Sequence, residues 1–193
     1  MKGQALPASS FATFTDPYPY QKSVQAGELE IVTASKGDFR AELTRINLHK
    51  LWMQRSSESL PLIRRALVTS ERAAIFFLPS EHQPAILING VETSPGKIVV
   101  WGRGATQHHL TSAPSQWGGM SMSHEDLAKA GRALVGRELG APPVTTTVRP
   151  RAPLMSRLLK LHEAAGNLAR TAPDPSLRSP RWLGRWSRRW CTR

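Results

Sequence analysis

Cysteine is nearly absent from this sequence: Cys191 is the one cysteine among 193 residues. A single thiol forms no internal disulfide and no thiolate metal cluster, which excludes the small disulfide-stapled secreted domains. No apolar run approaches the roughly 20 residues that a membrane-spanning helix needs. The N-terminus, MKGQALPASSFATF, has one lysine and no continuous apolar segment, unlike a secretory signal. We therefore expect a cytoplasmic protein with no membrane partner.

Motifs of nucleophilic and phosphate chemistry are also missing. No G-x-S-x-G elbow occurs, and the serines lie in turn-like runs. Gly102-Arg103-Gly104 is shorter than a phosphate-cradling loop and is interpreted as a plain loop after a strand. The sequence therefore predicts no catalytic residues, and we expect that the chain is not an enzyme.

Acidic residues are few, with 14 against 26 lysines and arginines, and the formal net charge is +12. Much of the excess lies in residues 173–193, which hold six arginines and Asp174. The remaining excess is diffuse and gives only non-specific attraction to phosphate. Trp182, Trp186 and Trp190 recur every four residues, a stripe that would suit an interfacial membrane or nucleic-acid element if it were helical. Because arginine, tryptophan, serine and proline crowd there without a core pattern, we interpret 173–193 as a disordered or non-native tail.

The clearest pattern in the chain is a strand pattern in residues 37–55, GDFRAELTRINLHKLWMQR. Phe39, Ala41 and Leu43 alternate with polar residues, which is the period of a strand with one buried face. The parity of the apolar residues then slips in residues 44–47, and the slip predicts a turn or bulge between paired strands. A strand pair cannot fold alone, so further strands must complete the sheet.

Shorter strand patterns surround this run, and we expect strands at 28–33, 73–78, 84–88, 97–101 and 117–122. Asn89-Gly90 is the dipeptide best suited to a tight hairpin turn. Residues 56–59 are interpreted as a loop, and 61–69 fit either a strand or a short helix. Residues 1–27 are expected to be irregular, because three prolines interrupt any helix there. Six or seven short strands with turns about every ten residues predict a sandwich or barrel.

The period changes to that of helices after residue 122. Ser123 is a helix N-cap with an acidic residue three positions on, and Gly136 or Gly140 ends this first helix. A second helix begins near Pro153. Its apolar residues have the a/d spacing of two heptads, and we expect them to form a dimer interface: Leu154, Leu158, Leu161, Ala165 and Leu168. The predicted fold class is mainly β with C-terminal helices, a β-barrel or sandwich followed by two α-helices.

Together these features resemble a known family. The residues that carry the resemblance are the run 37–55, the Asn89-Gly90 hairpin, HLTSAPSQWGGMSMSHEDLAKAGRALVGREL at 109–139, and Arg149, Pro150, Leu158, Leu161 and His162. Over residues 14–170 the chain is similar to the N-terminal regulatory part of AraC-type transcriptional regulators. The resemblance implies a cupin-like β-barrel or sandwich that binds a small effector and dimerises, ahead of two helix-turn-helix units that bind DNA.

The chain departs from this family after Arg170, where no stretch of about 100 residues with paired helix-turn-helix periodicity follows. We therefore expect a regulator truncated before its DNA-binding half, with no sequence-specific DNA binding of its own. Its partners would be a small-molecule effector and a second subunit, in a homodimer or in a heterodimer with an intact regulator. The expected organisation is an irregular lead-in at 1–27, a cupin-like sensor domain at 28–122, a helical dimerisation or linker segment at 123–172, and the tail at 173–193.

The resemblance also implies that the effector pocket lies inside the barrel. Strand phase selects five candidates to line it: Phe39, Arg40, Trp52, Trp101 and His109. Arg40 is the charged candidate, and it would contact an anionic effector.

Two alternatives stay open: a small cupin-type enzyme, and a basic nucleic-acid-binding protein that acts through its tail. Cupin enzymes hold a metal through a His-x-His pair, a nearby carboxylate and a distant histidine. His108 and His109 are instead adjacent, and adjacent residues of a strand point to opposite faces. The sequence therefore predicts no metal site and no cofactor. Bound metal would favour the enzyme, and salt-sensitive nucleic-acid binding that depends on the tail would favour the second alternative.

Overall fold

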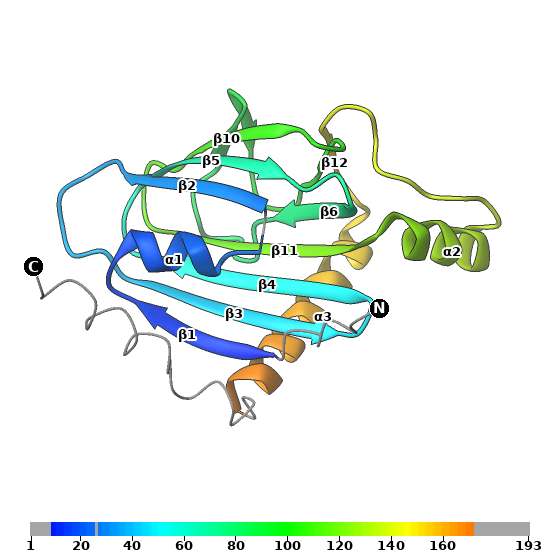
Figure 1. The fold of residues 1–193 in the computed structure, drawn as a ribbon, viewed down its shortest axis with the longest axis horizontal. Coiled ribbons are helices and arrows are strands. Elements are labelled where there is room, and N and C mark those ends of the chain that lie inside the picture. The colour runs from blue at the N-terminus through cyan, green and yellow to red at the C-terminus, as the bar shows by residue number, and fades with distance from the viewer. Residues whose placement is uncertain (1–8, 26, 172–193) are drawn as a thin grey trace, which may run out of the picture.

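The part of the chain that the structure describes folds as a sandwich of two antiparallel sheets with three helices (Figure 1). This computed structural model describes residues 9–25 and 27–171. The first sheet has the order β1 (Ser10–Phe14), β3 (Ala41–Leu48), β4 (Leu51–Glu58), β11 (Ser115–Ser123), β6 (Arg72–Phe77), β9 (Ile98–Val100) and β12 (Thr146–Val148). The second has the order β2 (Gly27–Thr33), β5 (Leu62–Val68), β10 (Thr106–Leu110), β7 (Ile86–Ile88) and β8 (Val91–Thr93). The helices are α1 (Pro17–Ser23), α2 (His124–Val135) and α3 (Ala152–Thr171). The prediction of a mainly β fold with C-terminal helices is confirmed.

The main core lies between the inner faces of the two sheets. β5 shows the alternation most clearly, because its odd and even residues alternate strictly between exposed and buried. Its inward side chains are those of Leu62, Arg64, Ala66 and Val68. An arginine therefore occupies a core position between aliphatic residues, which is unusual unless the charge is paired.

The turn predicted in residues 44–47 is wrong, because β3 runs without interruption to Leu48 and pairs with β4 through its whole length. The turn lies instead at His49, which has a φ of 63°. The apolar parity slips because β3 is buried on both faces. Leu43 faces the other sheet, whereas Ile46 packs with Met53 and Ala169 under α3.

Two polar or proline-rich segments also differ from expectation. Residues 56–58 continue β4 rather than forming a loop. Ser56 and Glu58 are buried there, and both are hydrogen-bonded: Ser56 Oγ donates to the Glu42 carbonyl, and Glu58 accepts from Arg64. The region 1–27 is not irregular in its described part, because it contains β1 and α1. Pro17 stands in the first turn of α1, where the missing N–H costs nothing, and Asp16 caps the helix by accepting from the Tyr18 N–H.

Short sequence patterns correctly predicted one hairpin turn and the start of α2. Asn89 and Gly90 have φ of 50° and 78° and join β7 to β8, as the dipeptide predicts. The Ser123 hydroxyl accepts from the Asp126 N–H at the start of α2, and Gly136 ends that helix in the left-handed region with a φ of 73°.

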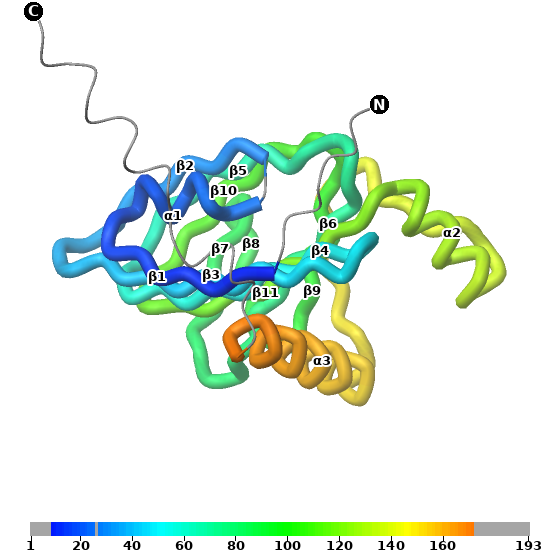
Figure 2. Tube along the Cα trace, turned by 60° about the horizontal axis from the view of Figure 1, so that its bottom comes forward, coloured from blue at the N-terminus to red at the C-terminus, as the bar shows by residue number. Residues whose placement is uncertain are grey.

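Helix α3 lies across the outer face of the seven-stranded sheet (Figure 2). Its buried residues are Met155, His162, Gly166 and Ala169. The His162 Nε2–H donates to the Gln54 carbonyl of β4 at 3.0 Å, and the ring meets Phe77 edge-on at 5.0 Å between centroids. Between α2 and α3 the short strand β12 joins the sheet beside β9, so the segment 123–172 is not wholly helical.

No helix in the described part of the chain is long and apolar enough to cross a membrane. The predicted tail at 173–193 lies outside the described residues.

Candidate functional site

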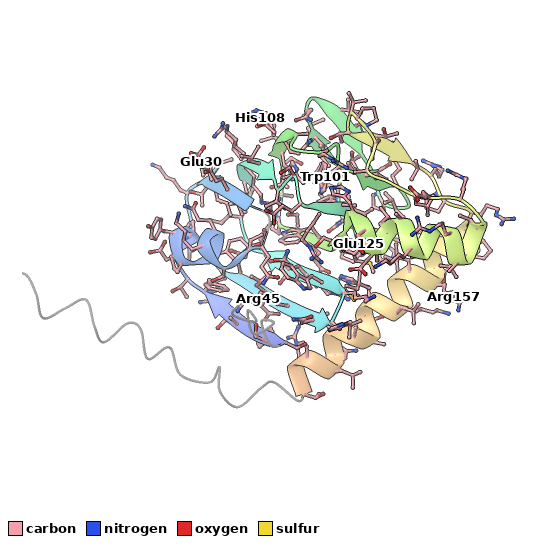
Figure 3. All side chains as sticks on the ribbon, turned by 45° about the vertical axis from the view of Figure 1, so that its right-hand side comes forward. Glu30, Arg45, Trp101, His108, Glu125 and Arg157 are labelled. Carbon is pink, nitrogen blue, oxygen red and sulfur yellow. The ribbon has the colours of Figure 1, made fainter. Side chains whose placement is uncertain are left out.

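A cavity lies between the two sheets, with an internal volume of about 100 Å³. Several elements that are far apart in the chain contribute to its wall, including α1, β4, β5, β6, β10 and β11. The side chains that matter for its chemistry are those of Tyr20, Gln25, Trp52, Gln54, Arg64, Phe76, Trp101, Gln107, His109 and Trp117. Figure 3 shows Trp101 within the sandwich, whereas His108 points to the outside.

Aromatic rings form much of the inner wall. Phe76 and Trp117 are stacked with centroids 6.2 Å apart and ring planes 20° from parallel. Trp101 and His109 form a second stacked pair at 5.4 Å and 21°. Phe76 also meets the His109 ring edge-on at 5.3 Å, which connects the two pairs. These four rings therefore belong to the cavity wall, together with aliphatic side chains such as those of Val24 and Leu29.

A buried ion pair supports the polar side of the cavity. The Arg64 guanidinium donates to the Glu58 carboxylate, and the side chain of Glu58 has no exposed surface. The same carboxylate accepts from Trp117 Nε1 at 2.9 Å, from Ser115 Oγ at 3.2 Å and from the Tyr20 hydroxyl. Glu58 is thus an anion whose oxygens are held by four donors, and it neutralises the charge of Arg64.

Burial changes the ionisation of the groups around this pair. Removal from water raises the pKa of Tyr20 and lowers that of Arg64, although the two groups partly offset these effects in each other. His109 lines the cavity beside them, and burial together with the nearby positive charge of Arg64 lowers its pKa to about 3. His109 is therefore a neutral imidazole at physiological pH, with one N–H donor and one acceptor nitrogen.

Several polar atoms in this wall have no hydrogen-bond partner among the described residues: Arg64 Nε, His109 Nδ1, His109 Nε2 and Trp52 Nε1. Gln107 is different, because its amide nitrogen donates to Thr145 Oγ1 and its amide oxygen accepts from Asn89 Nδ2, each at 2.7 Å. The unpartnered groups are concentrated around Arg64 and His109, where a bound molecule could complete them.

The structure brings together three of the five predicted pocket residues, Trp52, Trp101 and His109. Phe39 is buried and packs against Tyr20 with ring centroids 5.7 Å apart, but it does not line the cavity. Arg40 is exposed and lines a separate surface hollow instead, where its backbone N–H donates to Ser59 Oγ. The candidate for contact with an anion is therefore not at this cavity.

Sequence reasoning missed Arg64, Glu58 and Tyr20. A signal for Arg64 was present, because the alternation in LIRRALV places it on the same side as Leu62, Ala66 and Val68. Glu58 lay in a run of serines that looked like a loop, and Tyr20 lay in a segment rich in proline. Neither local pattern indicates that the two side chains meet, because they are 38 positions apart in the sequence.

His108 and His109 lie on opposite faces of β10, the first exposed and the second buried. Among the described residues no group of three or more His, Cys, Asp or Glu side chains is arranged to hold a metal ion.

Comparison with known proteins gives partial likenesses only. No family model matches the chain, and no curated protein is significantly similar to it. The solved structure of the AraC-like transcriptional activator CuxR is similar with 14% identity and a TM-score of 0.48, over 72% of this chain and 52% of that one. Protein Ylba from E. coli is similar with 10% identity and a TM-score of 0.37, over 77% of this chain and 55% of that one. The chain spans about half the length of these structures.

Proposed function

We propose that this chain is the effector-sensing and dimerisation domain of an AraC-type transcriptional regulator and that it has no catalytic activity. The observation that carries the proposal is the position of Gln54 on β4. Its side chain lines the cavity, while its carbonyl accepts the hydrogen bond from His162 of α3. A ligand cavity and a candidate dimer helix thus lie on the two faces of one strand.

The side chain of Gln54 also ties the cavity to the N-terminal segment. Its amide oxygen accepts from the Gln25 N–H and its amide nitrogen donates to the Gln25 carbonyl, both at 2.7 Å. A molecule that moves this side chain would act on β4 and on the segment before β2 together. Such a connection is what a sensor requires, because ligand binding must alter a second surface.

The candidate dimer surface is a row of exposed leucines on α3. Leu154, Leu161 and Leu168 are 53%, 61% and 70% exposed and follow one another at intervals of seven residues. Leu158 and Ala165 lie half-buried between this row and the buried face. Three large apolar side chains in line on a helix are the pattern of a helix that packs against another helix.

We propose that the chain has no catalytic activity because the buried carboxylate of Glu58 is already hydrogen-bonded within the protein. Glu58 is held by four donors, so it is stabilised as an anion and is not a free base. Metal analysis of the purified chain is expected to find no stoichiometric iron, manganese or zinc. A stoichiometric metal would favour a cupin-type enzyme instead.

Light scattering on the full chain tests the dimer. We expect a dimer for the parent and a folded monomer for the double variant Leu161→Glu/Leu168→Glu, because two charges at the row oppose helix pairing. The matched control is Ser156→Glu/Asn167→Glu, which adds the same charge at exposed positions on another side of α3. The control should remain a dimer. A parent that is monomeric, or a control that dissociates equally, would contradict the proposed interface.

A further inference from the structure

We propose that the cavity between the sheets takes a small, uncharged, planar aromatic compound that carries a hydrogen-bond acceptor such as a carbonyl group. This inference rests on the proposed sensing role of the same cavity and names the chemical class of its ligand. It follows from the shape of the wall, the unpartnered nitrogens and the balance of charge.

The planar shape follows from the ring pairs of the wall. Phe76 stacks with Trp117 and Trp101 stacks with His109, and all four rings line the cavity. Aromatic rings pack on such faces with offset-stacked or edge-on geometry. A volume of about 100 Å³ excludes a guest with more than one ring.

The acceptor follows from buried nitrogens that lack partners. Arg64 is 5% exposed and His109 is 7% exposed, and Arg64 Nε and both His109 ring nitrogens have no hydrogen-bond partner among the described residues. Arg64 Nε–H is a donor only, and a neutral imidazole brings one further N–H. A buried donor without a partner is unfavourable, so a guest with an acceptor at this place gains more than a hydrocarbon of equal size.

We infer an uncharged guest because the buried Arg64–Glu58 ion pair is already neutral. Arg64 is the one permanently charged side chain among the described residues that line the cavity, and Glu58 already neutralises it. His109 is neutral, since burial lowers its pKa to about 3. A carboxylate guest would bring a second anion close to Glu58, and a cationic guest would lie against Arg64. Each would be a buried charge without a free counter-ion.

Four single-ring probes of similar size test the inference on the full chain: benzamide, benzoate, benzamidinium and toluene. Isothermal titration calorimetry and the tryptophan fluorescence of the wall measure the affinities. Benzamide is expected to bind at least about tenfold more tightly than each of the other three, because it alone is neutral and carries a carbonyl.

The other outcomes each overturn the inference in a distinct way. Preferred binding of benzoate or benzamidinium would show that the cavity takes an ion, while leaving its sensing role in place. Equal binding of toluene would show that the nitrogens are not used. If no probe binds, the cavity does not take this class, whereas the dimer experiment on α3 still decides that part of the proposed function independently.

A pair of neighbouring variants places the binding at the unpartnered nitrogens. His109→Phe keeps a ring beside Trp101 but removes both nitrogens, so the preference for benzamide over toluene should fall by about tenfold. His108→Phe makes the same change on the exposed face of β10 and should keep the preference. Arg64→Lys keeps a cation for Glu58 and removes the Nε donor, which gives a second test if His109→Phe does not fold. A preference that survives in the folded variants would contradict the assignment.

Discussion

Two neighbouring arginines of β5 show what burial does to a charge at the residue scale. Arg64 is paired with Glu58 inside the sandwich. Arg65 points outward, where its Nη1 lies 3.5 Å from Glu30 Oε2, and the side chains of Arg65 and Glu30 are each more than half exposed. We expect Arg64→Met to lower the free energy of unfolding by about 3–5 kcal/mol, because it leaves the carboxylate buried without its cation. Arg65→Met should change it by less than about 0.5 kcal/mol. Urea denaturation measures both, and equal losses would contradict the buried pair.

His162 makes the stability of the fold sensitive to acid. Burial and the nearby charge of Arg55 lower its folded pKa to about 4, whereas an exposed histidine has a pKa of about 6.5. Because the unfolded chain binds the proton first as the pH falls, the stabilisation is complete above about pH 6.5 and is lost as the pH falls toward 4. The expected contribution of His162 is on the order of 3 kcal/mol across this window.

Urea denaturation at several pH values measures that contribution. His162→Gln retains an N–H donor for the Gln54 carbonyl and does not titrate, so its stability should fall less steeply between pH 6.5 and 4 than that of the parent. His82 is exposed, and His82→Gln should leave the slope unchanged. The assignment would be wrong if the two variants had the same pH dependence.

At the scale of elements, the contact between α3 and the sheet depends on a glycine of β11. A Cβ atom at Gly118 would lie 2.6 Å from the Phe77 ring and 3.1 Å from His162, whereas at Gly119 the nearest atom would be 3.6 Å away. We expect Gly118→Ala to lower the free energy of unfolding by about 1–3 kcal/mol through overpacking. Gly119→Ala should be nearly neutral or stabilising, because alanine restricts the unfolded chain. Thermal denaturation compares the pair, and a Gly118→Ala variant as stable as the parent would mean that α3 does not pack closely.

At the scale of the whole molecule, a sensor must couple its cavity to its dimer surface. If benzamide binding and dimerisation are coupled, each changes the equilibrium constant of the other by the same factor, typically about 5- to 150-fold. If the parent is a dimer and the Leu161→Glu/Leu168→Glu variant a monomer, as proposed, we expect the affinity for benzamide to differ between them by the same factor as benzamide shifts the dimer dissociation constant. Analytical ultracentrifugation and calorimetry measure the two sides. Equal affinities in dimer and monomer would show that the cavity does not sense through dimerisation.

Features that depend only on neighbouring residues could be predicted from the sequence. Short patterns predicted the Asn89-Gly90 turn and the Ser123 cap, because each is stabilised by backbone geometry within a few positions. They left Gly136 and Gly140 as alternatives for the end of α2, and the structure has Gly136 there. The apolar spacing of α3 was also readable, as was the mainly β character of the chain.

Which faces are buried and which side chains meet depends instead on contacts between elements that are distant in the sequence. Because α3 covers the outside of the sheet, β3 is apolar on both faces, and its pattern resembled a turn. Glu58 and Tyr20 were hidden in a polar run and a proline-rich segment, since their burial depends on contacts with Arg64 and Trp117 from other strands. A cavity wall assembled from distant strands leaves no local periodicity to read, which is why three of its five predicted residues line it and its central ion pair was missed.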